Sequence, residues 1–415
     1  MGQVFGEVKY LTFFLFISYQ FSGNYHKKSE GPFLKYSFLY FINLHMITYK
    51  NVLDKKVRNV KNILPDEYKR LDSSELEKRI NEKKEQLKSK ILILGHHYQR
   101  KEIINFSDYI GDSYFLSETA SKKEDISYII FCGVNFMAES AYILSGSSKT
   151  VLHPDTSAGC PLADMADIEN VERTWNDITA ICPGEYIIPV TYINSDAELK
   201  AFCGRNEGIV CTSSNAEGAI RWGFERGEKV FFFPDENLGK NTANKIGIKK
   251  DKIITWNPDE PYGGNSKNDI FKADIILWKG YCHVHTWFKT SHIEEMRKKY
   301  PDGAIIVHPE CYEEVVNMAD YSGSTGFIVK FVDKAPEGST VIIGTEINLI
   351  RRLDDQYPNK RIVPLSRSLC PNMWRISLND LLWTLDYLGE VNVINLPENI
   401  KREASISLER MLEVR

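Results

Sequence analysis

The stretch Asp274-Ile-Ile-Leu-Trp-Lys-Gly-Tyr-Cys-His-Val-His285 combines the pattern of a buried strand with two potential metal ligands. Its apolar run ends at Gly280, and Cys282 and His285 follow within five residues. Open α/β folds keep their functional groups at the carboxyl ends of the strands, so the stretch indicates a strand that presents a thiol and an imidazole at a sheet edge. The alternative for any single cysteine is that it serves as a small buried hydrophobic residue.

The same succession of features occurs three times along the chain. Each unit contains a strand with a polar end, a small polar turn, a strand that ends in an acidic residue, and then a cysteine. Helical stretches fill the gaps, and strands that alternate with helices indicate parallel βαβ units. The opening strands are expected at 91–94, 186–190 and 304–307, and the acid and cysteine that complete each unit are Asp155 with Cys160, Asp235 with Cys282, and Glu346 with Cys370.

This repeat predicts an α/β fold of three pseudo-symmetric βαβ domains, Rossmann-like and three-layered (α/β/α), around a central site. The predicted boundaries are 51–172 for a lead-in helix and the first domain, 173–294 for the second, and 295–415 for the third with two C-terminal helices. Residues 1–50 are expected to be a non-native or disordered extension, with translation starting near Met46. The apolar runs in this extension are too short to span a membrane, and no small-residue cleavage site indicates a signal peptide.

Composition argues against several classes of function. At 415 residues the chain is too long for a single core. Its formal net charge of -4 gives no support for a nucleic-acid partner, and the sequence has neither a Gly-x-Gly-x-x-Gly nor a Walker motif. The eight cysteines include no Cys-x-x-Cys pair, which leaves zinc ribbons and thioredoxin-like motifs unsupported. Thiols scattered through an α/β chain are typical of a reducing cytosol.

Three cysteines on three separate parts of the chain favour an iron–sulfur cluster over structural zinc, whose ligands usually come in close pairs. A cubane held by three thiolates leaves one iron without a protein ligand, and that iron can act as a Lewis acid toward a substrate oxygen. Spacing alone does not exclude the remaining cysteines, which are Cys132, Cys182, Cys203, Cys211 and Cys311.

Around the expected centre, the strand ends and turns supply hydroxyls, amides and imidazoles but little fixed charge. Such groups suit carboxylates and phosphate oxygens, which accept several hydrogen bonds at once. The candidates for proton transfer are His96, His308, Tyr98 and Glu310, although a single histidine can equally be a hydrogen-bonded interior residue. The full candidate set is His96, Tyr98, Ser113, Tyr192, Asn194, Ser213, His308, Glu310, Ser324 and Thr325.

From about Asn62 to its end, the chain resembles the quinolinate synthase family. The motifs that carry this resemblance, in order, are Gly95-His-His-Tyr98, Gly111-Asp-Ser113, Phe131-Cys-Gly-Val-Asn-Phe-Met-Ala-Glu139, Ala158-Gly-Cys160, Val190-Thr-Tyr-Ile-Asn194, Thr212-Ser-Ser-Asn-Ala216, Phe233-Pro-Asp-Glu-Asn-Leu-Gly239, Cys282-His-Val-His285, His308-Pro-Glu310, Gly323-Ser-Thr325 and Cys370-Pro-Asn-Met373.

The resemblance implies an oxygen-sensitive [4Fe–4S] transferase of NAD biosynthesis that works in the cytoplasm. Such an enzyme condenses iminoaspartate with dihydroxyacetone phosphate to quinolinate and releases phosphate and water. The implied partners are these small molecules and, through functional coupling, an aspartate-oxidising enzyme, with no nucleic acid and no membrane. The family's three related α/β domains around a central site agree with the repeat described above.

The resemblance also assigns residues. The cluster thiolates fall on Cys160, Cys282 and Cys370, and the catalytic roles fall on Glu310, Tyr98 and His96. His285 stands beside the substrate-binding positions, which are His96, Ser113, Tyr192, Ile193, Asn194, Ser213, His308, Pro309, Glu310 and Thr325.

Two departures from the family pattern and two alternatives stay open. Position 97 is His where family members usually carry Tyr or Asn, and no further cysteine stands near Cys370.

Diphthamide-synthesis proteins resemble the chain in having three such domains with one cluster thiolate from each. A cluster-bearing sensor or a solute-binding protein could use the same cleft, but neither would need proton carriers such as Glu310 and Tyr98 beside the cluster.

Overall fold

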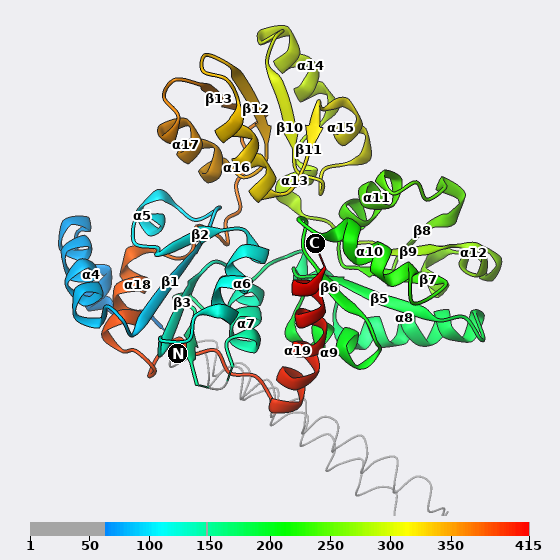
Figure 1. Cartoon of the computed structure of the whole chain (residues 1–415), viewed down its shortest axis with the longest axis horizontal. Coiled ribbons are helices and arrows are strands. Elements are labelled where there is room, and N and C mark those ends of the chain that lie inside the picture. The colour runs from blue at the N-terminus through cyan, green and yellow to red at the C-terminus, as the bar shows by residue number, and fades with distance from the viewer. Residues whose placement is uncertain (1–62, 147, 415) are drawn as a thin grey trace, which may run out of the picture. The chain divides into compact units, whose positions relative to one another are not determined.

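The structure, a computed structural model, describes residues 63–146 and 148–414. The expectations for residues 1–50 and for a start near Met46 lie outside these residues. From Leu64 onward the chain forms one compact unit, in which three parallel sheets are flanked by helices (Figure 1). The predicted α/β class with three-layer domains is confirmed. We call the three sheets with the helices between their strands the first, second and third lobes.

The first lobe is built on a sheet of order β2-β1-β3-β4. Every residue of β1, Ile91–His96, is buried, as is usual for parallel strands covered by helices on both faces. The other strands are β2 (Tyr109–Gly111), β3 (Tyr128–Cys132) and β4 (Thr150–Leu152), and the helices are α5 (Lys101–Ile104), α6 (Ser113–Lys122) and α7 (Asn135–Leu144).

The second lobe has the order β6-β5-β7-β9-β8, in which β8 is an additional edge strand. Strand β9, Ile275–Trp278, is the apolar run of the stretch Asp274–His285. Gly280 follows it because a Cβ there would lie 2.3 Å from the carbonyl oxygen of Pro234. The remaining elements are α8 (Ile168–Ile181), β5 (Ile187–Tyr192), α9 (Ala197–Arg205), β6 (Ile209–Cys211), α10 (Ala216–Phe224), β7 (Lys229–Phe233), α11 (Glu236–Lys245), β8 (Ile253–Trp256) and α12 (Lys267–Lys272).

The third lobe repeats the order of the first, as β11-β10-β12-β13. Helix α13, His283–Thr286, and helix α14, Thr290–Lys299, precede it and connect it to the second lobe. Its elements are β10 (Ala304–Val307), α15 (Glu313–Met318), β11 (Tyr321–Ser322), α16 (Thr325–Lys334), β12 (Thr340–Gly344), α17 (Ile347–Gln356) and β13 (Arg361–Pro364).

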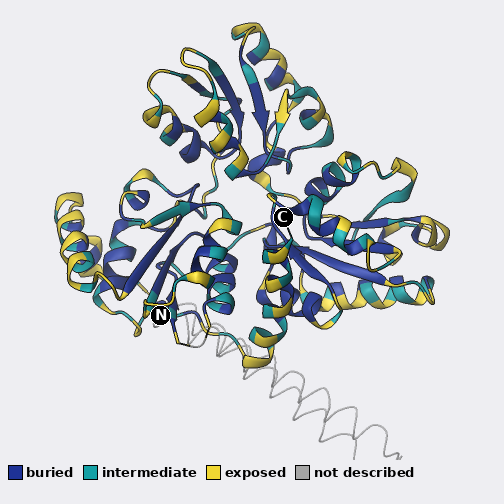
Figure 2. Ribbon diagram, viewed as in Figure 1, coloured by how far each residue is buried: buried dark blue, intermediate teal, exposed yellow. Residues whose placement is uncertain are grey.

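The strand registers make the three lobes equivalent residue by residue. In each lobe the first strand pairs with the second at matching positions, which are Leu94 with Tyr109, Val190 with Ile209, and Ile306 with Tyr321. The cysteine of each lobe follows the strand that pairs with the third strand on its outer side, which is β4, β9 or β13. Buried strands lie inside each lobe while the outer helix faces are exposed (Figure 2).

One detail of the predicted repeat is wrong. Asp235 and Glu346 follow the third strands β7 and β12, but Asp155 follows the fourth strand β4. The third strand of the first lobe ends instead in Cys132, followed by Gly133. The prediction omitted the strand before Cys370, because β13 is short, partly exposed, and contains Arg361 and Pro364, so it lacks a continuous apolar run.

The two C-terminal helices, which the predicted boundaries group with the third domain, pack on the other two lobes. Leu381 and Leu382 of α18, Leu378–Asp386, share a buried cluster with Leu76 of helix α4, Ser73–Leu87, beside the first lobe. Helix α19, Glu398–Glu413, runs beside α9 of the second lobe (Figure 1). The short helix α3, Asp66–Lys69, precedes α4.

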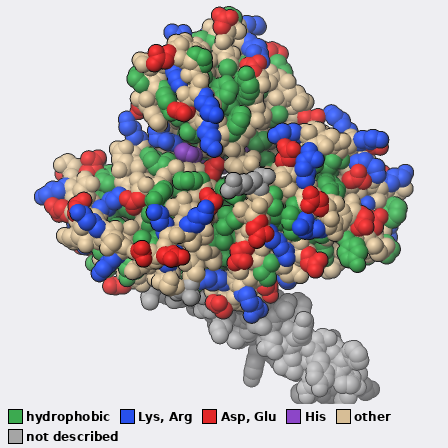
Figure 3. All heavy atoms as spheres, viewed as in Figure 1, with side chains coloured by type: hydrophobic (Ala, Val, Ile, Leu, Met, Phe, Trp, Pro, Cys, Tyr) green, Lys and Arg blue, Asp and Glu red, His purple; other side chains and the backbone are tan. Residues whose placement is uncertain are grey.

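Charged side chains of both signs are intermixed over the face in Figure 3, in keeping with the small net charge. Among the helices of residues 63–146 and 148–414, none has the length and hydropathy that crossing a bilayer requires.

Candidate active site

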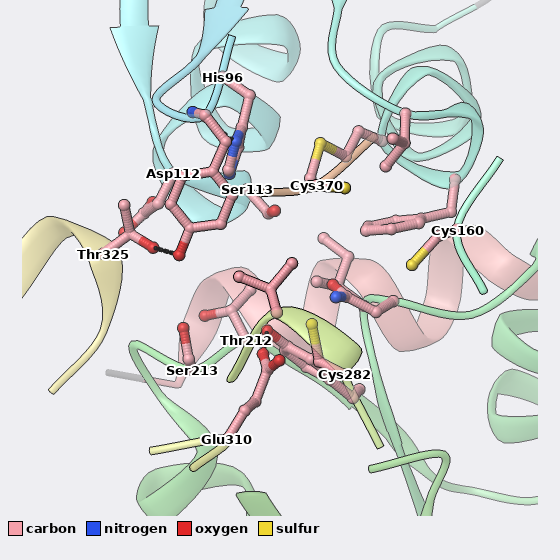
Figure 4. Close-up of a pocket in the computed structure, with 18 of the residues that line it drawn as sticks. His96, Asp112, Ser113, Cys160, Thr212, Ser213, Cys282, Glu310, Thr325 and Cys370 are labelled. Atoms are coloured by element: carbon pink, nitrogen blue, oxygen red, sulfur yellow. Dashed lines mark hydrogen bonds between the residues drawn. The ribbon is translucent and has the colours of Figure 1, made fainter. Parts of the chain in front are cut away.

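A pocket lies at the carboxyl ends of the strands, and all three lobes contribute to its wall (Figure 4). Every residue predicted for the site lines this pocket except Pro309 and Ser324. The Ser324 hydroxyl caps α16 instead, where it accepts a hydrogen bond from the Phe327 N–H at 3.2 Å. Pro309 lines a neighbouring cavity, and its carbonyl oxygen accepts a hydrogen bond from Asn241 Nδ2 at 2.8 Å. The pocket-lining members of the predicted set are His96, Tyr98, Ser113, Cys160, Tyr192, Ile193, Asn194, Ser213, Cys282, His285, His308, Glu310, Thr325 and Cys370.

The lobe equivalence explains why these residues meet. The matched residues of the first strands are Leu94, Val190 and Ile306. Two positions after each of them, the three lobes have His96, Tyr192 and His308. Parallel strands of related sheets bring their carboxyl ends to one centre, so residues at equivalent positions face the same space. Four positions beyond the matched residue of the first strand, the three lobes have Tyr98, Asn194 and Glu310. Four positions beyond the matched residue of the second strand, they have Ser113, Ser213 and Thr325.

A buried hydrogen-bond network joins the lobes at the pocket wall. The Tyr98 hydroxyl lies 2.9 Å from Thr325 Oγ1 and 2.7 Å from Thr345 Oγ1. Thr345 Oγ1 in turn lies 3.1 Å from His285 Nε2, and His285 Nδ1 lies 2.8 Å from Glu310 Oε2. The hydroxyl of Tyr192 donates to the other carboxylate oxygen, Glu310 Oε1. Both oxygens of the carboxylate therefore have a partner.

His96 and His308 are held in the same way. The backbone N–H of Tyr98 donates to His96 Nδ1 at 3.2 Å, and that of Glu310 donates to His308 Nδ1 at 3.3 Å. An imidazole whose Nδ1 accepts a hydrogen bond has its proton on Nε2 when neutral. Burial lowers the pKa of His96 and of His308 to about 3. Both rings are therefore neutral at pH 7, and each retains an Nε2–H donor for a ligand.

The carboxyl group of Glu310 is the main negative charge in this network. Burial by itself raises its pKa, but the neighbouring imidazoles and the hydrogen bonds from His285 and Tyr192 outweigh burial, so the pKa lies below its usual range. Burial raises the pKa of Tyr98 and Tyr192 well above 10, so both phenols stay protonated as donors.

Cys160, Cys282 and Cys370 differ from the other five cysteines of the chain. They are partly exposed and line the pocket, whereas the other five are buried. Their sulfur atoms, yellow in Figure 4, lie at one side of the pocket. Burial raises the pKa of all three thiols. Backbone N–H groups of Leu162 and Ala163 at Cys160, and those of Asn372 and Met373 at Cys370, act in the opposite direction and favour the thiolates.

These features fit a metal centre. Thiolate ligands need a cation and hydrogen-bond donors to offset burial, and backbone N–H groups directed at the sulfurs tune iron–sulfur clusters. A second donor set overlaps the first: ligand atoms of Cys282, His285 and Glu310 lie within 4.8 Å of one another. In this second set, His285 and Glu310 are already bonded to each other.

The prediction from sequence missed several wall residues. Asp112, Thr212 and Ser214 stand directly beside the predicted Ser113 and Ser213, so the turn motifs pointed to them. The apolar part of the wall had no chemical signal, although all of its members stand inside the family motifs. The apolar or small wall residues are Val134, Phe136, Met137, Gly159, Val284 and Met373.

Comparison with known proteins gives a consistent result. A family model described as "Quinolinate synthetase A protein" matches residues 78–413. A protein named "Quinolinate synthase" from Corynebacterium glutamicum is 48% identical over 357 residues, which cover 85% of this chain and 91% of that protein. One of the same name from Bacillus cereus (strain G9842) is 46% identical over 367 residues, covering 86% of this chain and 98% of that protein. A third, from Bacillus anthracis (strain CDC 684 / NRRL 3495), is 45% identical with the same coverage.

Proposed function

The chain belongs to the quinolinate synthase family, and from this premise we propose that it is a quinolinate synthase of NAD biosynthesis whose substrates are iminoaspartate and dihydroxyacetone phosphate. It condenses the two into quinolinate, with release of phosphate and water, and so acts as a transferase. The observation that supports this best is one pocket that combines three partly exposed thiols with hydrogen-bond donors from all three lobes. Both substrates are anions, and the donors suit their carboxylate and phosphate oxygens.

We propose further that Cys160, Cys282 and Cys370 hold a [4Fe–4S] cluster. The partial exposure of these three thiols and the N–H groups at two of the sulfurs support this assignment. When bound, such a cluster has one iron without a protein ligand and supplies a Lewis acid for substrate oxygens. Three reduced thiols of this kind also suit a cytoplasmic location.

The roles of the other residues follow from their hydrogen-bonding states. His96 with Ser113, and His308 with Thr325, each offer an Nε2–H and a hydroxyl, which together can hold one carboxylate. Tyr192, Asn194 and Ser213 complete the polar wall from the second lobe. Glu310, ionised and held by two donors, accepts protons during ring closure, and Tyr98, protonated within its network, supplies them. Orienting two reactants in one pocket accounts for a large part of the acceleration.

The test is anaerobic reconstitution with iron and sulfide, followed by an assay for quinolinate from dihydroxyacetone phosphate and iminoaspartate generated in place. The wild-type protein should be brown and should form quinolinate. Cys282→Ala should lose both the colour and turnover. Cys182→Ala is the matched control, because Cys182 is buried away from the pocket beside Ile270 and its loss should leave both properties intact. An active but colourless Cys282→Ala protein would contradict the ligand assignment.

A further inference from the structure

The chain segment that follows Asn194 is held at both ends by charged side chains. The Lys200 ammonium donates a hydrogen bond to the carbonyl oxygen of Ser195. Two residues further on, the backbone N–H of Ala197 donates to Glu139 Oε2 at 3.1 Å. Lys200 is part of α9 in the second lobe, whereas Glu139 is part of α7 in the first. One end of the segment is therefore held from another lobe.

Glu139 caps the N-terminus of α9 from another helix, because its carboxylate accepts a hydrogen bond from the first N–H group of α9. The first N–H groups of a helix need acceptors, and Asp is among the preferred N-cap residues. Asp196 stands at the N-cap of α9, yet its side chain accepts no hydrogen bond there. The Ala197 N–H is satisfied instead across the lobe junction by Glu139. The start of α9 is thus fixed relative to the first lobe.

The two charged groups lie in a water-poor environment at this junction. Lys200 is fully buried, and its ammonium lies 5.5 Å from the ring centre of Phe136, a residue of the pocket wall. Glu139 Oε1 accepts a hydrogen bond from Asn135 Nδ2 at 2.9 Å. Burial lowers the pKa of Lys200 and raises that of Glu139, and the attraction between the two opposite charges opposes both shifts. Asp196 is a second acid near both groups. Removing the Lys200 charge therefore leaves Glu139 without a counter-charge, and removing the Glu139 charge leaves Lys200 with Asp196 alone.

Helix α19 completes the surroundings of Lys200. The hydroxyl of Ser407 donates to the carbonyl oxygen of Lys200 at 2.7 Å. At Gly204, one turn further along α9, an added Cβ would lie 1.9 Å from the carbonyl oxygen of Glu403. Close packing of α9 on α19 leaves the helix little freedom to move. Within the second lobe, the Ser195 hydroxyl also donates to the carbonyl oxygen of Tyr192 at 2.8 Å, so the bond to Glu139 is the one that ties the segment to another lobe.

We propose that Glu139 and Lys200 are positioning residues that hold Tyr192 and Asn194 in their binding arrangement across the junction of the first and second lobes. Neither residue lines the pocket, so each acts through the segment it holds. The inference rests on the proposed function, because it takes Tyr192 and Asn194 as groups that touch the substrate. It adds two residues, and a junction between lobes, to the machinery of that site.

The test uses Glu139→Gln, Lys200→Met and the double variant, with quinolinate as the binding probe. Glu139→Gln keeps an acceptor oxygen for the Ala197 N–H, but it removes the charge and the second oxygen, which accepts from Asn135 Nδ2. Each single variant should bind quinolinate about tenfold more weakly, the change expected for loss of a charged buried contact. KM should rise while kcat changes less, because substrate placement is affected before chemistry. The double variant should be less impaired than the two single effects combined, because it leaves no unpaired charge.

The matched controls are Glu172→Gln and Arg205→Met. Arg205, at the far end of α9, forms an exposed ion pair with Glu172 of α8, with 2.6 Å between Arg205 Nη2 and Glu172 Oε1. Both controls should bind quinolinate like the wild type. Single variants that match the controls, or purely additive effects in the double variant, would overturn the proposal. If Lys200→Met does not fold, the proposal is tested by quinolinate binding of Glu139→Gln compared with that of Glu172→Gln.

A second measurement separates this inference from the proposed function. Amide hydrogen exchange over residues 192–200 of the reconstituted protein reports how firmly the segment is held, whatever reaction the protein catalyses. Faster exchange in Glu139→Gln and Lys200→Met, but not in the controls, is the expected result. A wild-type protein that forms no quinolinate refutes the proposed function, and unchanged exchange in the variants refutes the positioning role.

Discussion

The hydroxyl of Tyr192 donates a hydrogen bond of 2.5 Å to Glu310 Oε1, and this bond joins the second lobe to the third inside the pocket. Glu310 Oε2 is bound to His285 at 2.8 Å on its other side. A carboxylate with a donor on each oxygen has a fixed orientation before any ligand arrives. Such preorganisation is what a group that must accept a proton at a defined place requires.

Tyr192→Phe should therefore reduce quinolinate formation by about tenfold or more, because it leaves one buried carboxylate oxygen without its donor. The same change should lower the free energy of unfolding by ~1–3 kcal/mol. Steady-state kinetics and urea unfolding measure the two effects. Tyr186→Phe is the control, since this exposed tyrosine stands just before the same strand and its substitution should change neither quantity. Wild-type kinetics in Tyr192→Phe would refute a role for the bond in orienting Glu310.

The structure gives His97 a partner that the sequence could not supply. Arg352 Nη2 donates to His97 Nδ1 at 2.7 Å, which links the first lobe to α17 of the third beside His96 and Tyr98. Burial first, and then the Arg352 charge, hold the pKa of His97 well below its usual range, so the ring stays a neutral acceptor.

His97→Leu should cost ~1–3 kcal/mol of unfolding free energy, because it leaves a half-buried guanidinium donor without its acceptor. His97→Asn can offer its amide oxygen to Arg352 and should lose less than half as much. Urea denaturation of the two variants measures the difference directly. Equal losses in both variants would mean that side-chain volume, rather than the acceptor, explains the residue at position 97.

Much of the fold followed from hydrophobic runs that end in polar residues. Fully buried strands such as β1 and β9 read as continuous apolar stretches, so their positions and the three-lobe repeat were predictable. Strand β13 was not, because Arg361 and Pro364 interrupt the pattern at a sheet edge. The amphipathic pattern of α18 and α19 predicted helices, but it could not show which lobe their apolar faces would cover.

The candidate site was predictable for a related reason. Groups at the carboxyl ends of parallel strands gather at one edge of their sheet, and the threefold repeat predicts that the three edges face one centre. His96, Asn194 and Thr325, one from each lobe, could therefore be placed together from the sequence. What sequence could not give is the choice of partners between lobes. The bonds from Tyr98 to Thr345 and from Glu139 to Ala197 join residues far apart in the chain, and no local pattern encodes such pairs.

Gly326 should be intolerant of substitution although it stands inside helix α16. A Cβ there would lie 2.7 Å from Asp112 Oδ2, the atom that accepts the Ser214 hydroxyl at 2.9 Å. Asp112, Ser214 and Gly326 come from three different lobes, and the first two line the pocket. Gly326→Ala must displace the Asp112 carboxylate, whose other oxygen caps α6 through the Phe115 N–H.

In an ordinary helix Gly→Ala stabilises by ~1 kcal/mol. We expect Gly326→Ala instead to raise KM about threefold to tenfold, the size expected when one hydrogen bond at the pocket wall is lost. Ser214→Ala removes the same bond without crowding and should raise KM by a smaller factor. If Gly326→Ala were more stable than the wild type with an unchanged KM, the contact among the three lobes would have no part in shaping the pocket.

His153 should make the free energy of unfolding depend on pH. It is fully buried in the first lobe, and its Nε2–H donates to the carbonyl oxygen of Gly133 at 3.3 Å. Burial lowers its pKa from 6.5 to about 4, although the Gly133 bond and the Asp155 charge oppose the shift. Between pH 6.5 and 4, the unfolded chain therefore binds a proton at this residue that the folded chain does not bind.

The sign of the effect follows from that difference. Stability rises with pH wherever the unfolded state binds more protons, so the His153 contribution is complete above pH 6.5 and is lost as the pH falls toward 4. His153→Gln cannot titrate, yet its amide can still donate to Gly133. The difference in unfolding free energy between wild type and His153→Gln should therefore shrink by about 3 kcal/mol from pH 7 to pH 4, at ~1.4 kcal/mol per pH unit. Urea titrations at several pH values measure this, and a difference that stays constant would show that His153 is protonated in the folded protein.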